Sequence, residues 1–132
     1  MSKDKPLIAI VDDDTSVCRA VKRLVRSAGM EADTFTSGQE FVESLDGRPA
    51  PEVDCLVLDV QMPQMNGLEV QRRLETREHH IPIIFITAHD DDDIRTRALA
   101  AGAVAFLRKP FNDDLFIRTV QEALKRHAAQ SP

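Results

Sequence analysis

Strand-like and helix-like segments alternate five times along the chain, and this alternation limits the fold more than any other feature. Four apolar runs and one weaker run predict strands at Leu7–Val11, Glu31–Phe35, Val53–Leu58, Ile83–Thr87 and Ala103–Leu107. A helix signal follows each of them. Because parallel strands must be joined by crossover segments, the pattern predicts an α/β fold: a doubly wound parallel sheet with helices on both faces.

Caps and glycines mark the expected ends of the helices. The first helix carries apolar residues from Val17 to Ala28, with Asp14 or Thr15 as N-cap and Gly29 as its stop. Ser37 and Glu40 predict a capping box for a second helix, which buries Phe41 and Leu45. The other helices are expected at Gly67 to about Thr76, at Asp90–Ala101 before Gly102, and at about Asn112–His127, burying Phe116, Val120 and Leu124.

Length, composition and charge exclude several classes of protein. The 132 residues are enough for one domain, and a net charge of −5 leaves no basic surface typical of a nucleic-acid binder. No apolar stretch approaches the roughly 20 residues that cross a bilayer, and the start MSKDKP lacks a signal-peptide core. We therefore expect a cytoplasmic protein without membrane contact. Cys18 and Cys55 lie in apolar patterns and are expected to be small core residues.

Polar side chains stand where four of the predicted strands end, and in doubly wound sheets the carboxyl ends of the strands form the ligand site. These residues are Asp12, Asp13 and Asp14, then Asp59, Thr87 and Lys109. Each has an ordinary structural explanation alone: acids at a helix start, a hydroxyl at a strand end, a surface lysine. Their combination on one rim predicts a functional site.

The chemistry of this set points to phosphoryl transfer. Two carboxylates about 4 Å apart repel by about 4 kcal/mol at an effective dielectric of about 20, and a hard cation such as Mg²⁺ removes that repulsion. Asp12, Asp13 and Asp59 are the candidate metal ligands, with the backbone carbonyl of Gln61 completing the shell. Asp59 is then placed as a nucleophile toward phosphorus, with Lys109 and Thr87 contacting the oxygens of the transferred group.

These same segments resemble a known family. The stretches IVDDD (10–14), LVLDVQMPQMNG (56–67), IIFITA (83–88) and GAVAFLRKPF (102–111) are similar to the receiver domain of two-component response regulators. The resemblance implies a flavodoxin-like (βα)₅ fold with strand order 2-1-3-4-5. It also implies that Asp59 accepts a phosphoryl group from a sensor histidine kinase, with Mg²⁺ held by Asp12 or Asp13, Asp59 and the Gln61 carbonyl.

The resemblance assigns further roles. Thr87 and Phe106 would form the switch pair, and Lys109–Pro110 would be a cis peptide bond. The side chains of Gln61 and His89 would flank the path of the hydrolytic water and set the lifetime of the phosphoryl group. The protein would be a switch rather than an enzyme with a separate substrate, catalysing only its own phosphorylation and dephosphorylation.

Within the family, the second half of the chain looks most like the FixJ-type transcription regulators, which carry a carboxy-terminal helix-turn-helix domain. We expect residues 1–132 to be a receiver domain with no output domain within the chain, so that any DNA contact belongs to a missing domain. We expect phosphorylation to favour a homodimer through the face formed by the fourth helix, fifth strand and fifth helix. The residues Arg95, Arg97 and Arg118 belong to this face, and the sequence alone leaves docking of another partner open there.

Other functions remain open at this point. A stand-alone receiver in a phosphorelay would share all these features. A degenerate receiver that only binds a partner is not favoured, because all the key side chains are present. Asp12-x-Asp14-x-Ser16 formally matches the nucleophile motif of haloacid-dehalogenase phosphatases, with Asp12 as nucleophile, but that function leaves Asp59 unexplained. A flavin binder on this fold needs a phosphate loop where this chain has three aspartates, and the chain has no Trp or Tyr to stack on the flavin.

Overall fold

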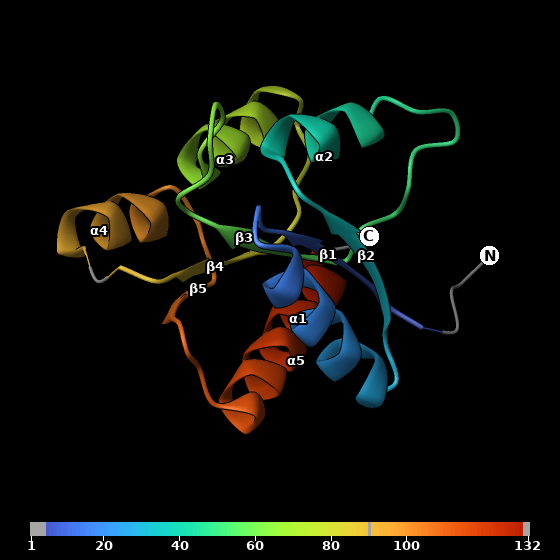
Figure 1. The fold of residues 1–132 in the computed structure, drawn as a ribbon. Coiled ribbons are helices and arrows are strands. Elements are labelled where there is room, and N and C mark those ends of the chain that lie inside the picture. Colours follow the sequence, from blue (N-terminus) through green and yellow to red (C-terminus); the bar gives the residue numbers. More distant parts are fainter. Residues whose placement is uncertain (1–4, 90, 131–132) are drawn as a thin grey trace.

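Residues 5–89 and 91–130 are described by the computed structural model, and within them five parallel strands form one sheet. The strands are β1 (Leu7–Val11), β2 (Glu31–Phe35), β3 (Cys55–Asp59), β4 (Ile83–Thr87) and β5 (Ala105–Arg108). Their order is β2-β1-β3-β4-β5, which confirms the expected flavodoxin-like topology. The order reverses between β1 and β3, which lie side by side in the middle of the sheet (Figure 1).

Helices cover both faces of this sheet, as the alternation predicts. They are α1 (Thr15–Ser27), α2 (Gly38–Ser44), α3 (Gly67–Thr76), α4 (Asp92–Ala100) and α5 (Asp113–Gln130). In Figure 1, α1 and α5 lie on one side of the sheet and α2, α3 and α4 on the other. None of the helices in the described residues is both long enough and apolar enough to span a bilayer.

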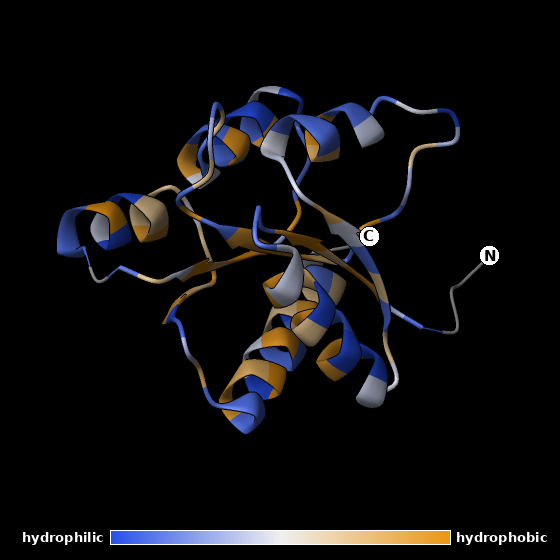
Figure 2. Ribbon diagram, in the orientation of Figure 1, coloured by the Kyte–Doolittle hydropathy of each residue, from blue (hydrophilic) through white to orange (hydrophobic). Residues whose placement is uncertain are grey.

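The core has two halves, one on each face of the sheet. Successive strand residues point to opposite faces, so Ile8 and Ile10 pack with α1 and α5, whereas Ala9 and Val11 pack toward α2 and α3. The strands β1, β3 and β4 are hydrophobic and buried along almost their whole length, whereas the helices mix hydrophobic and hydrophilic residues (Figure 2). Cys18 and Cys55 are buried, as expected, and burial raises the pKa of both thiols, which disfavours the thiolate form.

Three strands have the predicted bounds, and two are shifted toward their carboxyl ends. The β3 ladder with β1 begins at the pair Ile8–Cys55, so β3 starts two residues later than expected and includes Asp59. The β5 strand also starts two residues late, because its pairing with β4 begins at Ile84–Ala105. Both shifts arise from pairing with a neighbouring strand, which the apolar runs themselves do not specify.

Asp14, rather than Thr15, is the N-cap of α1, because its carboxylate accepts hydrogen bonds from the backbone N–H groups of residues 16 and 17. Asp91 caps α4 in the same way, so this helix starts at Asp92 and not at Asp90, which lies outside the described residues. Gly29 and Gly102 follow the ends of α1 and α4 with positive φ, which confirms them as stops.

The capping box predicted at the start of α2 is only half formed. The Ser37 hydroxyl accepts from the Glu40 N–H, but the described contacts include no return bond from the Glu40 side chain. A complete box stands instead at the start of α3, between Asn66 and Glu69. The N-x-x-E spacing there is the signal that could have revealed it.

The final helix is longer than expected and turns a slightly different face to the sheet. It runs to Gln130, and Phe116, Val120 and Ala123 are fully buried while Leu124 is half-buried. The buried residues thus lie at spacings of four and three, which keeps one stripe against the sheet.

Candidate functional site

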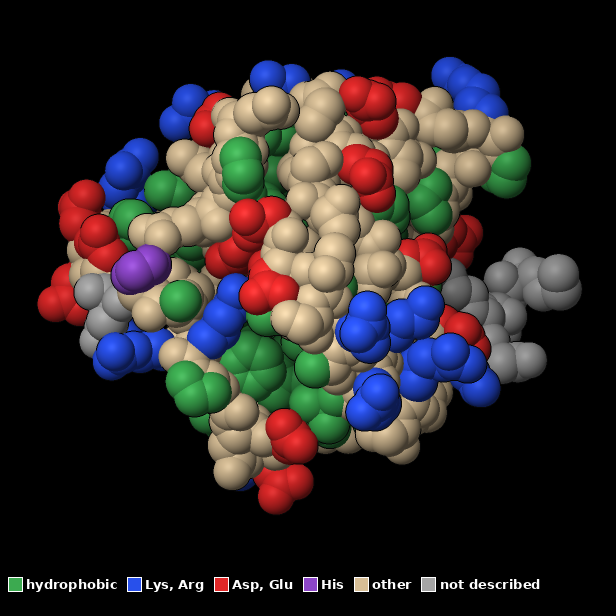
Figure 3. All heavy atoms as spheres, viewed as in Figure 1, with side chains coloured by type: hydrophobic (Ala, Val, Ile, Leu, Met, Phe, Trp, Pro, Cys, Tyr) green, Lys and Arg blue, Asp and Glu red, His purple; other side chains and the backbone are tan. Residues whose placement is uncertain are grey.

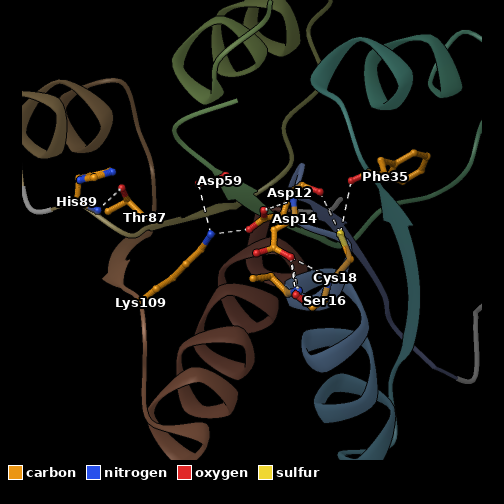
Figure 4. A network of polar contacts seen from close by, with 10 residues as sticks. Asp12, Asp14, Ser16, Cys18, Phe35, Asp59, Thr87, His89 and Lys109 are labelled. Carbon is orange, nitrogen blue, oxygen red and sulfur yellow. Dashed lines mark hydrogen bonds and ion pairs between the residues drawn. The ribbon is translucent and has the colours of Figure 1, made fainter. Parts of the chain in front are cut away.

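Asp12 and Asp59 meet at the point where the strand order reverses. Val11 pairs with Leu58, so Asp12 directly follows β1 beside Asp59, the last residue of β3. Figure 4 shows these side chains with Lys109, which comes from the loop after β5, on one rim of the sheet. The structure therefore brings together residues that are almost the whole chain apart in sequence.

Three carboxylates of this site form a compact acidic group. Asp12 is fully buried, Asp59 is 5% exposed and Asp13 is open to solvent. One oxygen from each lies within 4.8 Å of the others. Hard carboxylate oxygens in a partly open cluster are the ligands that Mg²⁺ prefers, and a neighbouring backbone carbonyl such as that of Gln61 is a further ligand of the same kind. The donor set thus fits the predicted ion.

Lys109 neutralises part of this charge. Its Nζ donates to Asp12 Oδ2 at 2.7 Å and lies 3.7 Å from Asp59 Oδ1. The other oxygen of Asp12, Oδ1, accepts from the Asp14 N–H at 2.9 Å. The Lys109–Pro110 bond is cis, as expected. Both carboxylate oxygens of Asp12 therefore accept a hydrogen bond. Asp59 lies farther from the Lys109 ammonium group than Asp12 does, so its ion pair with Lys109 is the weaker of the two.

The electrostatics of the site separate Asp59 from an ordinary aspartate. Burial, and next the negative charge of Asp12, raise the pKa of Asp59 to about 7, although Lys109 and the Gln61 N–H act in the opposite direction. For Lys109, burial alone would lower the pKa, but the bond to Asp12 and the charge of Asp59 outweigh it, and the pKa is raised. The protein groups around Asp59 thus only partly compensate the negative charge of its ionised form.

A tight turn after β3 presents Asp59 at the rim. The Gly67 N–H donates to the Val60 carbonyl at 2.8 Å, which closes the turn, and Asn66 then caps α3. A Cβ at Gly67 would stand 2.6 Å from the Asp59 carbonyl oxygen, so only glycine fits. The Asn-Gly pair in the sequence thus serves both the helix cap and the close approach to the Asp59 backbone.

Thr87 and His89 lie beside this group rather than in contact with it. Thr87 is buried at the end of β4, and its hydroxyl oxygen accepts from the His89 N–H at 3.1 Å. No hydrogen bond joins Thr87 to Asp59 among the described residues. The side chains of His89 and Gln61 are exposed. Figure 4 shows Thr87 and His89 together, to one side of the carboxylates.

Phe106 and the three predicted surface arginines occupy different environments. The Phe106 ring is buried, next to the ring of Phe85, with 6.2 Å between the two centroids. Arg95, Arg97 and Arg118 are all exposed.

Two local contacts of the site escaped sequence analysis. The Cys18 thiol donates to the Asp12 carbonyl oxygen at 3.2 Å, and the Arg95 guanidinium lies over the Phe106 ring. Both contacts depend on how a helix packs against the end of a strand, and they involve residue types common in other roles, so no sequence motif could have revealed them.

Comparison with known proteins settles the family. The profile described as "Response regulator receiver domain" matches residues 8–121. The chain belongs to this family. It is 41% identical over 125 residues, 95% of its length, to the response regulator protein TodT of Pseudomonas putida, of which it covers 54%. It is 33% identical to the transcriptional regulatory protein FixJ of Bradyrhizobium diazoefficiens, with 90% of this chain and 57% of FixJ covered.

Solved structures agree with this assignment. A response regulator receiver protein from Burkholderia phymatum is 60% identical, with a TM-score of 0.82 over 92% of this chain and 96% of that one. The FixJ receiver structure, FixJ-N, is 31% identical, with a TM-score of 0.84 and coverage of 93% and 96%. This receiver domain spans about half the length of the first curated relatives that it matches, and one of these, FixJ, is named a transcriptional regulatory protein. A haloacid-dehalogenase-like phosphatase is not favoured.

Proposed function

We propose that this receiver domain takes a phosphoryl group from a phosphohistidine of a sensor histidine kinase onto Asp59, with Mg²⁺ as cofactor. The observation that carries the proposal is the position of Asp59. It is nearly buried, next to two further carboxylates, and 3.7 Å from an ammonium group that is hydrogen-bonded to Asp12. Of these carboxylates, Asp59 is the last residue of an apolar strand, and its ion pair with Lys109 is longer than that of Asp12.

The transfer is a single displacement at phosphorus. An oxygen of the Asp59 carboxylate attacks, the phosphorus–nitrogen bond to the imidazole breaks, and its electron pair stays on the imidazole nitrogen. The product is an acyl phosphate on Asp59. Lys109 can shift from Asp12 toward the new phosphoryl oxygens. The Thr87 hydroxyl accepts one hydrogen bond from His89, so its proton is free to be donated to another of those oxygens.

Asp12, Asp13, Asp59 and the Gln61 carbonyl would hold the magnesium ion. When bound, it supplies positive charge to the transferred oxygens and removes the repulsion among the carboxylates. Backbone contacts position two of these acids. The Asp14 N–H donates a hydrogen bond to the Asp12 carboxylate, and the turn closed at Gly67 fixes the backbone next to Asp59.

The surface around the site supports a protein as phosphoryl donor. An apolar hollow of about 510 Å³ opens beside Lys109, between α1 and the β5–α5 loop; it is lined by residues that include Val17, Leu24, Pro110 and Phe111. Figure 3 shows hydrophobic side chains gathered below the acidic group, with Lys and Arg side chains beside them. The exposed face of α1 carries four cations at helical spacing, Arg19, Lys22, Arg23 and Arg26, with Lys22 half-buried.

Charge reversal on α1 tests this docking surface. We expect Arg19→Glu with Arg23→Glu to slow transfer from the kinase at least ten-fold at low salt, because an acidic partner helix would meet like charge, and to weaken the salt dependence of the rate. Phosphorylation by acetyl phosphate, which needs no docking, serves as the control and should stay unchanged. Equal loss with both donors would refute the docking surface.

The same phosphorylation would act as a switch. Its output would be transcription through a helix-turn-helix domain, as in FixJ-type relatives, with phosphorylation-dependent dimerisation through α4, β5 and α5. We further propose that the domain catalyses its own dephosphorylation and that the exposed Gln61 and His89 side chains set the lifetime of the acyl phosphate. An unchanged half-life in Gln61→Ala and in His89→Ala would discard that role.

Covalent trapping locates the acceptor. After incubation with acetyl phosphate and Mg²⁺, borohydride reduces an aspartyl phosphate to homoserine, which peptide sequencing places in the chain. The proposal expects homoserine at position 59. Homoserine at position 12 would point instead to chemistry of the phosphatase type and would contradict the assignment.

A further inference from the structure

The side chain of Phe106, on β5, lies inside the protein. The side chain is 8% exposed. It pairs in register with Phe85 on the neighbouring strand, so both rings project to the same face of the sheet. The rings are tilted by 40° and packed against each other within the core half that α2, α3 and α4 cover.

Phe85 in turn abuts the turn that presents Asp59. Its ring is fully buried, and its Cε1 atom lies 2.9 Å from the place where a Cβ of Gly67 would stand. That same position is 2.6 Å from the Asp59 carbonyl oxygen. The ring therefore has no free space on this side, and Phe106, Phe85 and the backbone after Asp59 form one continuous contact.

Arg95 covers the other side of Phe106. Its guanidinium carbon lies 5.8 Å from the ring centroid, within the range of a cation–π interaction. Arg95 is three residues before Ala98, the fully buried residue of α4, so it sits on the edge of the helix nearest the sheet. Among the described residues, none of the carboxylates forms an ion pair with Arg95, so its guanidinium interacts with the face of the Phe106 ring instead.

We propose that Arg95 is a positioning residue that holds the Phe106 ring in its inward position. The proposal rests on the proposed function and adds a regulator to the same site. The position of α4 would then be linked to the turn after Asp59 through Phe106 and Phe85. The inward ring belongs to the conformer that accepts the phosphoryl group. Loss of Arg95 therefore lowers the population of that conformer and slows phosphorylation about two- to five-fold, the size of an exposed cation–π contact.

Two measurements on three test variants, with Phe106→Leu as a fourth variant for assignment, test this. Nuclear Overhauser contacts between the rings of Phe85 and Phe106, assigned with Phe106→Leu, report the ring position in the unphosphorylated protein. The initial rate with acetyl phosphate and Mg²⁺ reports the effect on Asp59. We expect Arg95→Ala to weaken the ring contact and slow phosphorylation two- to five-fold, and Arg95→Lys to restore part of both. Arg73→Ala, which removes an exposed arginine of α3, should change neither.

The outcomes separate this inference from the proposed function. Absence of the ring contact in the wild-type protein would overturn the inference, as would an equal slowing in Arg73→Ala and Arg95→Ala. If wild-type Asp59 accepts no phosphoryl group at all, the proposed function fails. In that case, the ring contact in Arg95→Ala still decides whether Arg95 holds Phe106.

Discussion

Asp59 ends a strand whose other four residues are apolar, and it keeps a carboxylate in a place that favours the neutral acid. Burial and the charge of Asp12 raise its pKa to about 7, so the metal-free protein must either protonate this group or bear its charge at a cost. The carboxylate proposed to react, that of Asp59, should thus also destabilise the folded protein. Stability measurements can test this without any phosphoryl transfer.

The pH dependence of stability should expose this group. The pKa of Asp59 is raised from about 4 in the unfolded chain to about 7 in the folded protein. Between pH 4 and pH 7, therefore, the Asp59 carboxyl group is protonated mainly in the folded protein. The free energy of unfolding should fall as the pH rises through this window. Above pH 7 the metal-free Asp59→Asn variant should therefore be more stable than wild type, by on the order of 3 kcal/mol.

Urea unfolding of both proteins at pH 5 and pH 8, in chelator and then in excess Mg²⁺, measures this difference. The advantage of Asp59→Asn should shrink at pH 5, and Mg²⁺ should reduce it at pH 8 by stabilising wild type more. Equal stability of the two proteins at both pH values would show that Asp59 is not destabilising.

At the scale of elements, the turn between β3 and α3 fixes where Asp59 stands. We expect Gly67→Ala to destabilise the protein by about 1–3 kcal/mol, because the new methyl group would overlap the Asp59 carbonyl oxygen and the Phe85 ring. The same variant should slow phosphorylation, since the acceptor backbone must move.

Thermal unfolding and the acetyl phosphate rate measure the two effects. Gly47→Ala is the control, because Gly47 lies in an exposed loop where the nearest backbone oxygen is 3.3 Å from the added atom and the loop can adjust. If the two variants behaved alike, the close approach at Gly67 would have no special importance.

The elements also show what the sequence can and cannot predict. The strands β1, β2 and β4 have their predicted bounds, since turn residues flank each run. The start of α4 could not be placed, because any residue in a run of four aspartates can serve as the cap. The site residues were found through the rule that ligands bind at strand ends, which needs only strand order. The inward Phe106 and the hollow beside α1 depend on side-chain packing between distant segments, which no local pattern encodes.

At the scale of the whole molecule, the site and the proposed dimer face lie on different elements. Leu99 of α4 and Leu115 of α5 are the large hydrophobic side chains exposed in the described residues, at 42% and 43%. We expect an unphosphorylated monomer and a phosphorylated dimer, and we expect Leu99→Asp to weaken the dimer at least ten-fold without slowing phosphorylation, because a buried unpaired charge is costly at an interface.

Analytical ultracentrifugation with and without acetyl phosphate measures the association. Gln39→Asp on α2, away from this face, is the control and should dimerise as wild type does. A phosphorylated protein that stays monomeric at high concentration would contradict the proposed dimer.

The central claim is that Asp59, its neighbouring acids and Lys109 form one magnesium-dependent phosphoacceptor site. Intact-mass measurement after exposure to acetyl phosphate tests it most directly, with wild type and Asp59→Asn each treated with Mg²⁺ or with chelator. The account predicts the added mass of one phosphoryl group in wild type with Mg²⁺ and in none of the other three samples. The same added mass in Asp59→Asn, or no added mass in wild type, would contradict it.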